Sequence, residues 1–184
     1  MVDFTLHDTD SAPAEARERL AGAEQAMGFV PNLFAHMAEA PASLEAYQTL
    51  DGLFAKTSLS AVEREVVLLS VSVENRCHFC VAAHSGRAKQ AGMDDNVLAA
   101  LRAGAQLPDG RLAALAGFTR SVVRERGWAG NEAVAAFLEA GFTRAQVLEV
   151  VLGVSLKTLS NYANHLTGTP LNRELESLAW HDAA

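Results

Sequence analysis

Signals for the start and the end of helices recur along the whole chain, and no alternating apolar and polar run of useful length, which would indicate a β-strand, lies between them. Two capping boxes, Ser60–Glu63 and Thr143–Gln146, each precede an apolar run. Gly92, Gly141 and Gly168 follow later segments, as glycines do at helix ends. Alanine, leucine and glutamate, which favour helices, dominate the composition. The pattern predicts an all-α fold.

The predicted helices cover residues 12–27, a short turn from 31, 41–55, 60–75, 77–91, 95–103, 109–126, 131–140 and 143–165, with a weakly anchored helical tail from 172. No linker or low-complexity segment divides the chain, and 184 residues are enough for a sizeable core. We therefore expect one helical domain over residues 1–184.

A faint internal similarity accompanies these signals. A shift of 83 residues aligns Ser60–Glu63 with Thr143–Gln146, and Cys77–Cys80 with Ser160–Ala163. Either a helical unit is duplicated and its second copy has lost the thiols, or two amphipathic helices have similar caps.

Charge and composition restrict the classes of partner. The formal net charge is −7, and the 15 lysine and arginine residues do not cluster, which argues against nucleic-acid binding. The first residues form neither the basic nor the apolar region of a signal peptide. Glutamates interrupt the apolar stretches before any reaches the length of a membrane span. We expect a cytoplasmic protein without a nucleic-acid or membrane partner.

The only two cysteines, Cys77 and Cys80, are three positions apart, a spacing that chance would give about once in a hundred such chains. Two cysteines are too few for a disulfide framework, so the pair favours redox or metal chemistry over two small buried side chains. His84 follows Cys80 by four residues, so a helix places both cysteines and this imidazole on one face. A helix N-terminus and a nearby imidazole both favour a thiolate.

Glu65 is the best candidate for a carboxylate that orients His84. The helix expected over 60–75 is apolar on most faces, which predicts that it is buried. A buried carboxylate must be paired or must change its pKa, so Glu65 is more informative than a surface glutamate. The alternative is that Glu65 only pairs with an arginine such as Arg64 or Arg87.

Glu65, Cys77, Cys80 and His84, in this order and spacing, are similar to the signature of the alkylhydroperoxidase D-like branch of the carboxymuconolactone decarboxylase superfamily. The resemblance extends over about residues 25–172. Other segments resemble the peroxidase-related members of that branch: residues 28–34, 40–41, 59–65, 161–165 and 169–172.

The resemblance implies an all-α homo-oligomer, a trimer or hexamer, with sites near the subunit contacts. It implies reduction of hydroperoxides by the cysteine pair without a further cofactor or metal, and an external dithiol or thiol protein as reductant. In such proteins a glutamate and a histidine, here Glu65 and His84, form a proton relay to Cys80 and Cys77. The best-studied members have a histidine where this chain has Phe79, with His78 one position earlier, so the donor or substrate should differ. The decarboxylases lack the cysteine pair, so we do not expect their activity.

Several alternatives stay open at this stage. The helix dipole favours Cys77 as the attacking thiol, whereas the spacing to His84 favours Cys80, which we prefer. The dithiol could instead serve disulfide exchange or redox sensing without efficient peroxide turnover. A metal-binding module on Cys77, Cys80 and His84 would need His78 or His165 as a fourth ligand.

Overall fold

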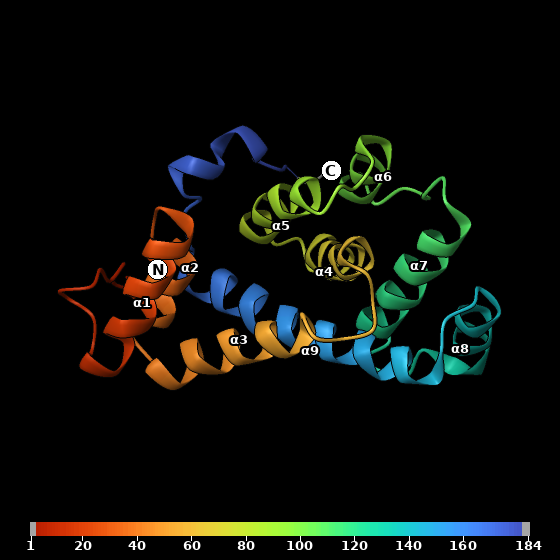
Figure 1. Ribbon diagram of the computed structural model, residues 1–184, viewed down its shortest axis with the longest axis horizontal. Coiled ribbons are helices and arrows are strands. Elements are labelled where there is room, and N and C mark those ends of the chain that lie inside the picture. The colour runs from red at the N-terminus through yellow and green to blue at the C-terminus, as the bar shows by residue number, and fades with distance from the viewer. Residues whose placement is uncertain (1–2, 182–184) are drawn as a thin grey trace.

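The computed structural model describes residues 3–181, which form helices and connecting segments without a strand (Figure 1). Within this range the elements are α1 (Ala14–Met27), α2 (Asn32–Met37), α3 (Pro41–Phe54), α4 (Ala61–Glu74), α5 (His78–Gln90), α6 (Asp95–Arg102), α7 (Gly110–Arg124), α8 (Gly130–Glu139), α9 (Arg144–Thr167) and the 3-10 helix η1 (Arg173–Leu178). The all-α class is confirmed. None of these helices is both long enough and apolar enough to cross a bilayer.

Helix α4 lies in the middle of the molecule. Figure 1 shows α5 and α6 on one side of it, α7 on another, and α9 along the opposite edge beside α3. Eight consecutive residues, 65–72, are buried on α4, so neighbours cover every face of this helix, as its all-round apolar character predicted. Any polar group that α4 carries must therefore find its partner inside the protein.

Both capping boxes form and fix the registers of α4 and α9. The Glu63 amide donates to Ser60 Oγ at 3.2 Å, and the Ser60 amide donates to the Glu63 carboxylate at 2.8 Å. Thr143 and Gln146 repeat the exchange at the start of α9. Each box satisfies amides that the first helical turn leaves free, so these helix starts were predictable from local sequence.

The internal similarity does not extend to a repeated unit. Between α4 and α5 the chain bends at Arg76, whose φ of 54° lies in the left-handed region. The aligned residues 158–160 lie inside the uninterrupted α9. The two segments therefore share a capped apolar helix start, and the duplicated helix pair is not found.

The expectation of a weakly anchored tail was wrong. The Asn172 side chain accepts from the Asn32 amide at 2.8 Å and donates to the Val30 carbonyl at 3.1 Å. Further on, Trp180 is buried and its indole N–H donates to the Arg102 carbonyl at 2.8 Å. These partners are distant in sequence, so the local pattern could not indicate them.

The closest approach of α9 to its neighbours gives a first prediction. A Cβ at Gly153 would lie 2.8 Å from both Phe54 Cζ and Val67 Cγ1. We expect Gly153→Ala to lower the free energy of unfolding by about 1–3 kcal/mol, because the overlap forces side chains or helices apart. Urea denaturation measures this difference.

The matched control is Gly117→Ala on α7, where a Cβ meets nothing within 4 Å. This change should be neutral, or stabilising by up to about 1 kcal/mol through helix propensity. Equal losses in the two variants would contradict the packing argument.

Candidate active site

The two thiols lie at the start of α5, where the helix faces α9. Cys77 is the N-cap residue and Cys80 the third residue of the helix, and each is only 1% exposed. The Cys77 thiol donates a hydrogen bond to the sulfur of Cys80. From α9, the Asn164 amide nitrogen lies 3.2 Å from Cys80 Sγ and 3.6 Å from Cys77 Sγ. One amide donor thus serves both sulfurs.

The surroundings push the two thiol pKa values apart. Burial raises the pKa of Cys80, but the hydrogen bond from Cys77 and the ammonium of Lys157 outweigh burial and hold it well below its ordinary value. The pKa of Cys77 is raised, first by its hydrogen bond to Cys80 and then by burial. The surroundings therefore favour the thiolate at Cys80 and the thiol at Cys77.

Glu65 and His84 meet inside the protein, as the sequence indicated. His84 Nδ1 donates to Glu65 Oε2 at 2.8 Å, and both side chains are buried. The other carboxylate oxygen forms an ion pair with Arg87, whose Nε lies 3.2 Å away, and Arg87 also pairs with Asp51. Glu65 therefore has both expected kinds of partner at once. Arg64 points elsewhere, because its guanidinium donates to a backbone carbonyl.

The charge of Glu65 is retained despite its burial. Burial raises the pKa of this carboxyl, but His84 and Arg87 together lower it below its ordinary value. Since the folded pKa is depressed, the pairing stabilises the fold above the unfolded pKa and is lost as the pH falls through the folded pKa.

Lys157 on α9 is the site residue that the sequence analysis missed. It is 1% exposed, its Nζ lies 3.0 Å from His84 Nε2, and its positive charge lowers the pKa of the Cys80 thiol. The missed signal is that Lys157 is the only charged residue between positions 150 and 164, a stretch that is otherwise mostly apolar. A lysine in the middle of a buried helix is almost always paired.

Lys157 also settles the protonation of His84. The imidazole donates from Nδ1 to Glu65, so Nε2 accepts from the ammonium. Burial and then the Lys157 charge lower the pKa of His84, which keeps the ring neutral. No hydrogen bond joins His84 to either sulfur among the described residues. The link from His84 to the thiolate therefore runs through Lys157.

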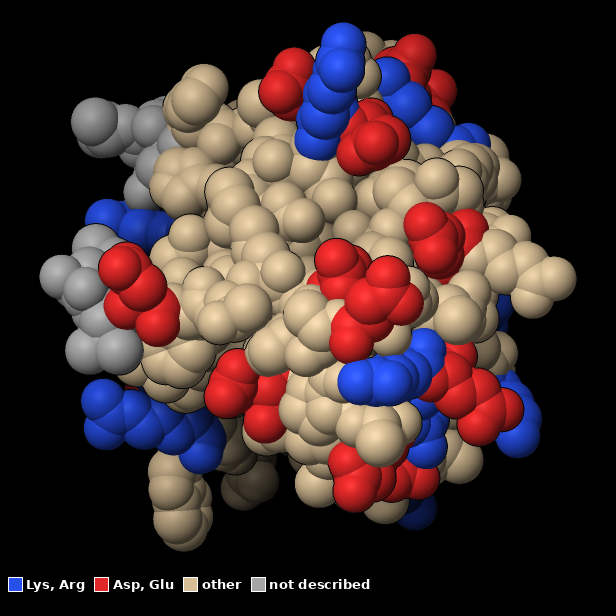
Figure 2. All heavy atoms as spheres, turned by 90° about the vertical axis from the view of Figure 1, so that its left-hand side faces the viewer, with Lys and Arg blue, Asp and Glu red and all other residues tan. Residues whose placement is uncertain are grey.

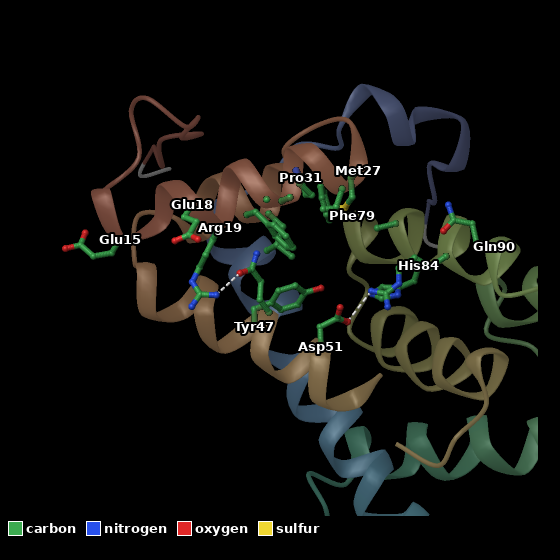
Figure 3. A pocket seen from close by; sticks show the side chains of 18 residues that line it. Glu15, Glu18, Arg19, Met27, Pro31, Tyr47, Asp51, Phe79, His84 and Gln90 are labelled. Atoms are coloured by element: carbon green, nitrogen blue, oxygen red, sulfur yellow. Dashed lines mark hydrogen bonds and ion pairs between the residues drawn. The ribbon is translucent and has the colours of Figure 1, made fainter. Parts of the chain in front are cut away.

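A pocket of about 880 Å³ reaches this network from the surface between α1, α3 and α5 (Figure 3). Its lining includes the buried side chains of Tyr47, Phe79 and His84, and Phe79 lies between the two cysteines in the sequence. Figure 3 shows the Tyr47 hydroxyl pointing toward His84, and burial raises the pKa of that phenol to about 12. The hydroxyl forms no hydrogen bond within residues 3–181, so it is free to donate to a ligand in the pocket.

Acidic and basic side chains are interspersed with uncharged areas on the face shown in Figure 2. The remaining histidines lie away from the thiols. His78 hydrogen-bonds to the Trp180 carbonyl at 2.8 Å, and His165 is an exposed neighbour of Tyr162. No group of three or more His, Cys, Asp or Glu side chains suited to a metal ion occurs in the part of the chain described. The four-ligand metal arrangement is therefore not formed, and the ammonium of Lys157 would oppose a cation beside Cys80.

Known proteins share this architecture. The model of the Carboxymuconolactone decarboxylase family matches residues 41–121, which include Glu65, both cysteines and His84. The alkylhydroperoxidase AhpD core from Ralstonia eutropha JMP134, an uncharacterized peroxidase-related protein, superposes with a TM-score of 0.82 at 25% identity, covering 94% of this chain and 93% of that one. The sequence has no significant match among curated proteins.

Two further structures share the fold at lower identity. An uncharacterized peroxidase-related protein from Silicibacter sp. TM1040 gives a TM-score of 0.78 at 22% identity and covers 93% of each chain. The debrominase Bmp8, as a cysteine-to-alanine variant in complex with 2,3,4-tribromopyrrole, superposes with a TM-score of 0.78 at 14% identity. The match covers 97% of this chain and 95% of that one.

The fold and the buried dithiol thus define a helical protein of the alkylhydroperoxidase type. The family model over residues 41–121 and the similarity to the AhpD core from Ralstonia eutropha JMP134 support the alkylhydroperoxidase D-like and carboxymuconolactone decarboxylase superfamily that the sequence signature indicated.

The buried carboxylate gives a second prediction. Glu65→Gln leaves Arg87 and Lys157 with less negative charge nearby, so we expect a loss of about 2–3 kcal/mol in the free energy of unfolding at neutral pH. The loss should shrink as the pH falls from about 4.5, the ordinary pKa of a glutamate, through the lower pKa of the folded carboxyl, because wild-type Glu65 is then protonated as well. Urea denaturation across this pH range measures both effects.

Glu74→Gln is the matched control, since Glu74 lies on the same helix and its partner Arg124 is 62% exposed. We expect Glu74→Gln to lower the free energy of unfolding by at most about 1 kcal/mol. Equal effects of the two substitutions, or a Glu65→Gln loss that is unchanged at low pH, would contradict the buried-pair argument.

Proposed function

We propose that the protein reduces hydroperoxides with the Cys77 and Cys80 dithiol. The observation that supports this most directly is the pair of buried thiols that share one amide donor, since Asn164 Nδ2 lies 3.2 Å from Cys80 Sγ and 3.6 Å from Cys77 Sγ. A thiol peroxidase needs a thiolate to attack the peroxide and a second thiol within reach to resolve the product.

In the proposed reaction the Cys80 thiolate attacks the terminal oxygen of a hydroperoxide. The S–O bond forms as the O–O bond breaks, which gives a sulfenic acid and an alkoxide that is protonated to the alcohol. The Cys77 thiol then condenses with the sulfenic acid to a disulfide and water. An external dithiol or thiol protein reduces the disulfide and restores the starting state.

Glu65 and His84 act as positioning residues in this scheme. Glu65 fixes the tautomer of His84, and the free nitrogen of His84 holds the Lys157 ammonium beside the thiolate. The substrate reaches the site through the pocket, whose inner wall combines the aromatic rings of Phe79 and Tyr47 with one free hydroxyl. Such a lining suits an organic hydroperoxide with an apolar group.

Disulfide exchange or redox sensing without efficient turnover is the competing function. Exchange with a protein partner requires an accessible sulfur, whereas both sulfurs here are buried. A small peroxide that enters the pocket needs no such exposure. Saturable consumption of peroxide with an added dithiol favours the peroxidase, whereas slow stoichiometric oxidation favours exchange.

The homo-oligomer expected from the resemblance stays a prediction. Helix α9 carries exposed apolar side chains at Leu148, Val151, Tyr162 and Leu166, which a second copy would cover. A monomeric mass in light scattering would contradict the oligomer without affecting the proposed chemistry.

The proposed reaction is tested with anaerobically reduced protein and one equivalent of an organic hydroperoxide. We expect rapid loss of two thiols per peroxide, with a rate that changes little with pH around neutrality because Cys80 is already a thiolate. An ordinary thiol, with a pKa of about 8.5, would instead react roughly tenfold faster for each added pH unit below that value.

Two variants assign the roles of the cysteines. Cys80→Ser should abolish the rapid loss, whereas Cys77→Ser should still consume one peroxide and stop at a sulfenic acid, which dimedone traps for mass spectrometry. A dimedone adduct on Cys77 in the wild-type protein, with Cys80 unmodified, would reverse the assignment. Unchanged thiols after peroxide addition would move the function to disulfide exchange.

A further inference from the structure

Lys157 is enclosed at the point where three helices meet α9. The titratable groups that face it are Tyr47 from α3, Glu65 from α4, and Cys77, Cys80 and His84 from α5. Its nitrogen lies 3.0 Å from His84 Nε2 and interacts electrostatically with Cys80, and no carboxylate in residues 3–181 lies within ion-pair distance of it. The Cys80 thiolate is therefore the anion that directly balances the ammonium.

This balance depends on the redox state of the dithiol. In the reduced protein the negative Cys80 sulfur offsets the cost of burying the ammonium, and the pKa of Lys157 is raised even though burial lowers it. In a Cys77–Cys80 disulfide both sulfurs are neutral. The ammonium would then be buried without a contacting anion, a situation that favours the neutral amine.

We propose that Lys157 is a catalytic residue that carries one of the two protons of the redox cycle. It is an ammonium beside the thiolate in the dithiol state and a neutral amine in the disulfide state. The inference rests on the dithiol cycle proposed above and gives Lys157 a step for which Glu65 and His84 are less well placed, since neither hydrogen-bonds to a sulfur within residues 3–181.

With this assignment each proton of the redox cycle has a donor and an acceptor. When the Cys80 thiolate breaks the O–O bond, the departing alkoxide forms beside the Lys157 ammonium and takes its proton, which yields the alcohol. Cys77 then gives its thiol proton to the hydroxide that leaves Cys80 as water. Reduction of the disulfide by a dithiol supplies two electrons and two protons, one to Cys77 and one to Lys157, which restores the ion pair.

The contact with His84 permits both states of Lys157. An amine still has N–H donors, so Lys157 can keep donating to His84 Nε2 after it has lost a proton. The neutral imidazole, fixed by Glu65, is an acceptor in either state. The site can therefore change its charge without rearranging the hydrogen bonds that hold the lysine.

The protonation of Lys157 can be observed directly, because the chain has only three lysines. In protein labelled with ¹³C at the lysine ε-carbon, Lys56 and Lys89 are exposed and serve as internal ammonium references. We expect the Lys157 signal to show an ammonium in the reduced protein and an amine after oxidation by diamide, both near neutral pH. An ammonium in both states would overturn the proposal. The Lys157→Met spectrum assigns the signal.

A second measurement counts protons at equilibrium with reduced and oxidised dithiothreitol. If reduction of the protein disulfide takes up two protons, it matches dithiothreitol, and the equilibrium constant is independent of pH around neutrality. If Lys157 keeps its proton throughout, reduction takes up one, and the constant rises tenfold for each pH unit. The tenfold slope overturns the proposal, and a pH-independent constant supports it only together with the change in the Lys157 signal, because two ordinary thiols would also take up two protons.

Lys157→Arg is the matched variant, because a guanidinium keeps the positive charge but does not release its proton. We expect the equilibrium constant with dithiothreitol to rise tenfold for each pH unit in this variant and to be independent of pH in the wild type. Should the larger side chain prevent folding, the spectra of the wild-type protein still decide. Failure of the wild-type protein to form a disulfide in these buffers would overturn the dithiol cycle itself, whereas a disulfide beside a persistent ammonium would overturn only the role of Lys157.

Discussion

The contact between the Lys157 ammonium and the Cys80 sulfur is the interaction on which the rest of the site depends. Neither charge could be buried alone, because an isolated ion in the interior changes its protonation rather than staying charged. The same requirement continues outward from His84 to Glu65 and then to Arg87 at the pocket. These groups come from α9, α5 and α4. The three helices must therefore pack so that the charged groups meet, and the same packing sets the chemistry of the thiols.

The fold was largely predictable because its signals are local. Capping boxes at Ser60 and Thr143 fixed the helix starts, and the all-round apolar character of residues 61–74 placed α4 in the core. The anchoring of Asn172 and Trp180 was not predictable, since their partners are about 140 and 78 positions away in the sequence. Sequence periodicity describes a helix and its faces, but it does not say which distant carbonyl a tail residue will meet.

The site was predictable to the same extent and for the same reason. Cys77, Cys80 and His84 belong to one helix, so their spacing alone brings them together. Lys157 and Asn164 complete the site from α9, more than 70 positions beyond His84, and only the crossing of α9 over α5 aims them at the sulfurs. A lone charge in an apolar stretch shows that a partner must exist, but the identity of that partner depends on the tertiary structure.

The fold alone does not choose the reaction, since the debrominase Bmp8 has the same architecture at 14% identity. The choice must come from the immediate surroundings of the sulfurs. Here Cys80 has a cation and an amide donor, whereas Cys77 donates its proton to its neighbour. In the proposed reaction, attack by Cys80 consumes the thiolate that stabilises the cation, so the site that favours the first step no longer favours a charged lysine after it. A proton released at that moment, beside the leaving oxygen, follows from the same electrostatics that formed the thiolate.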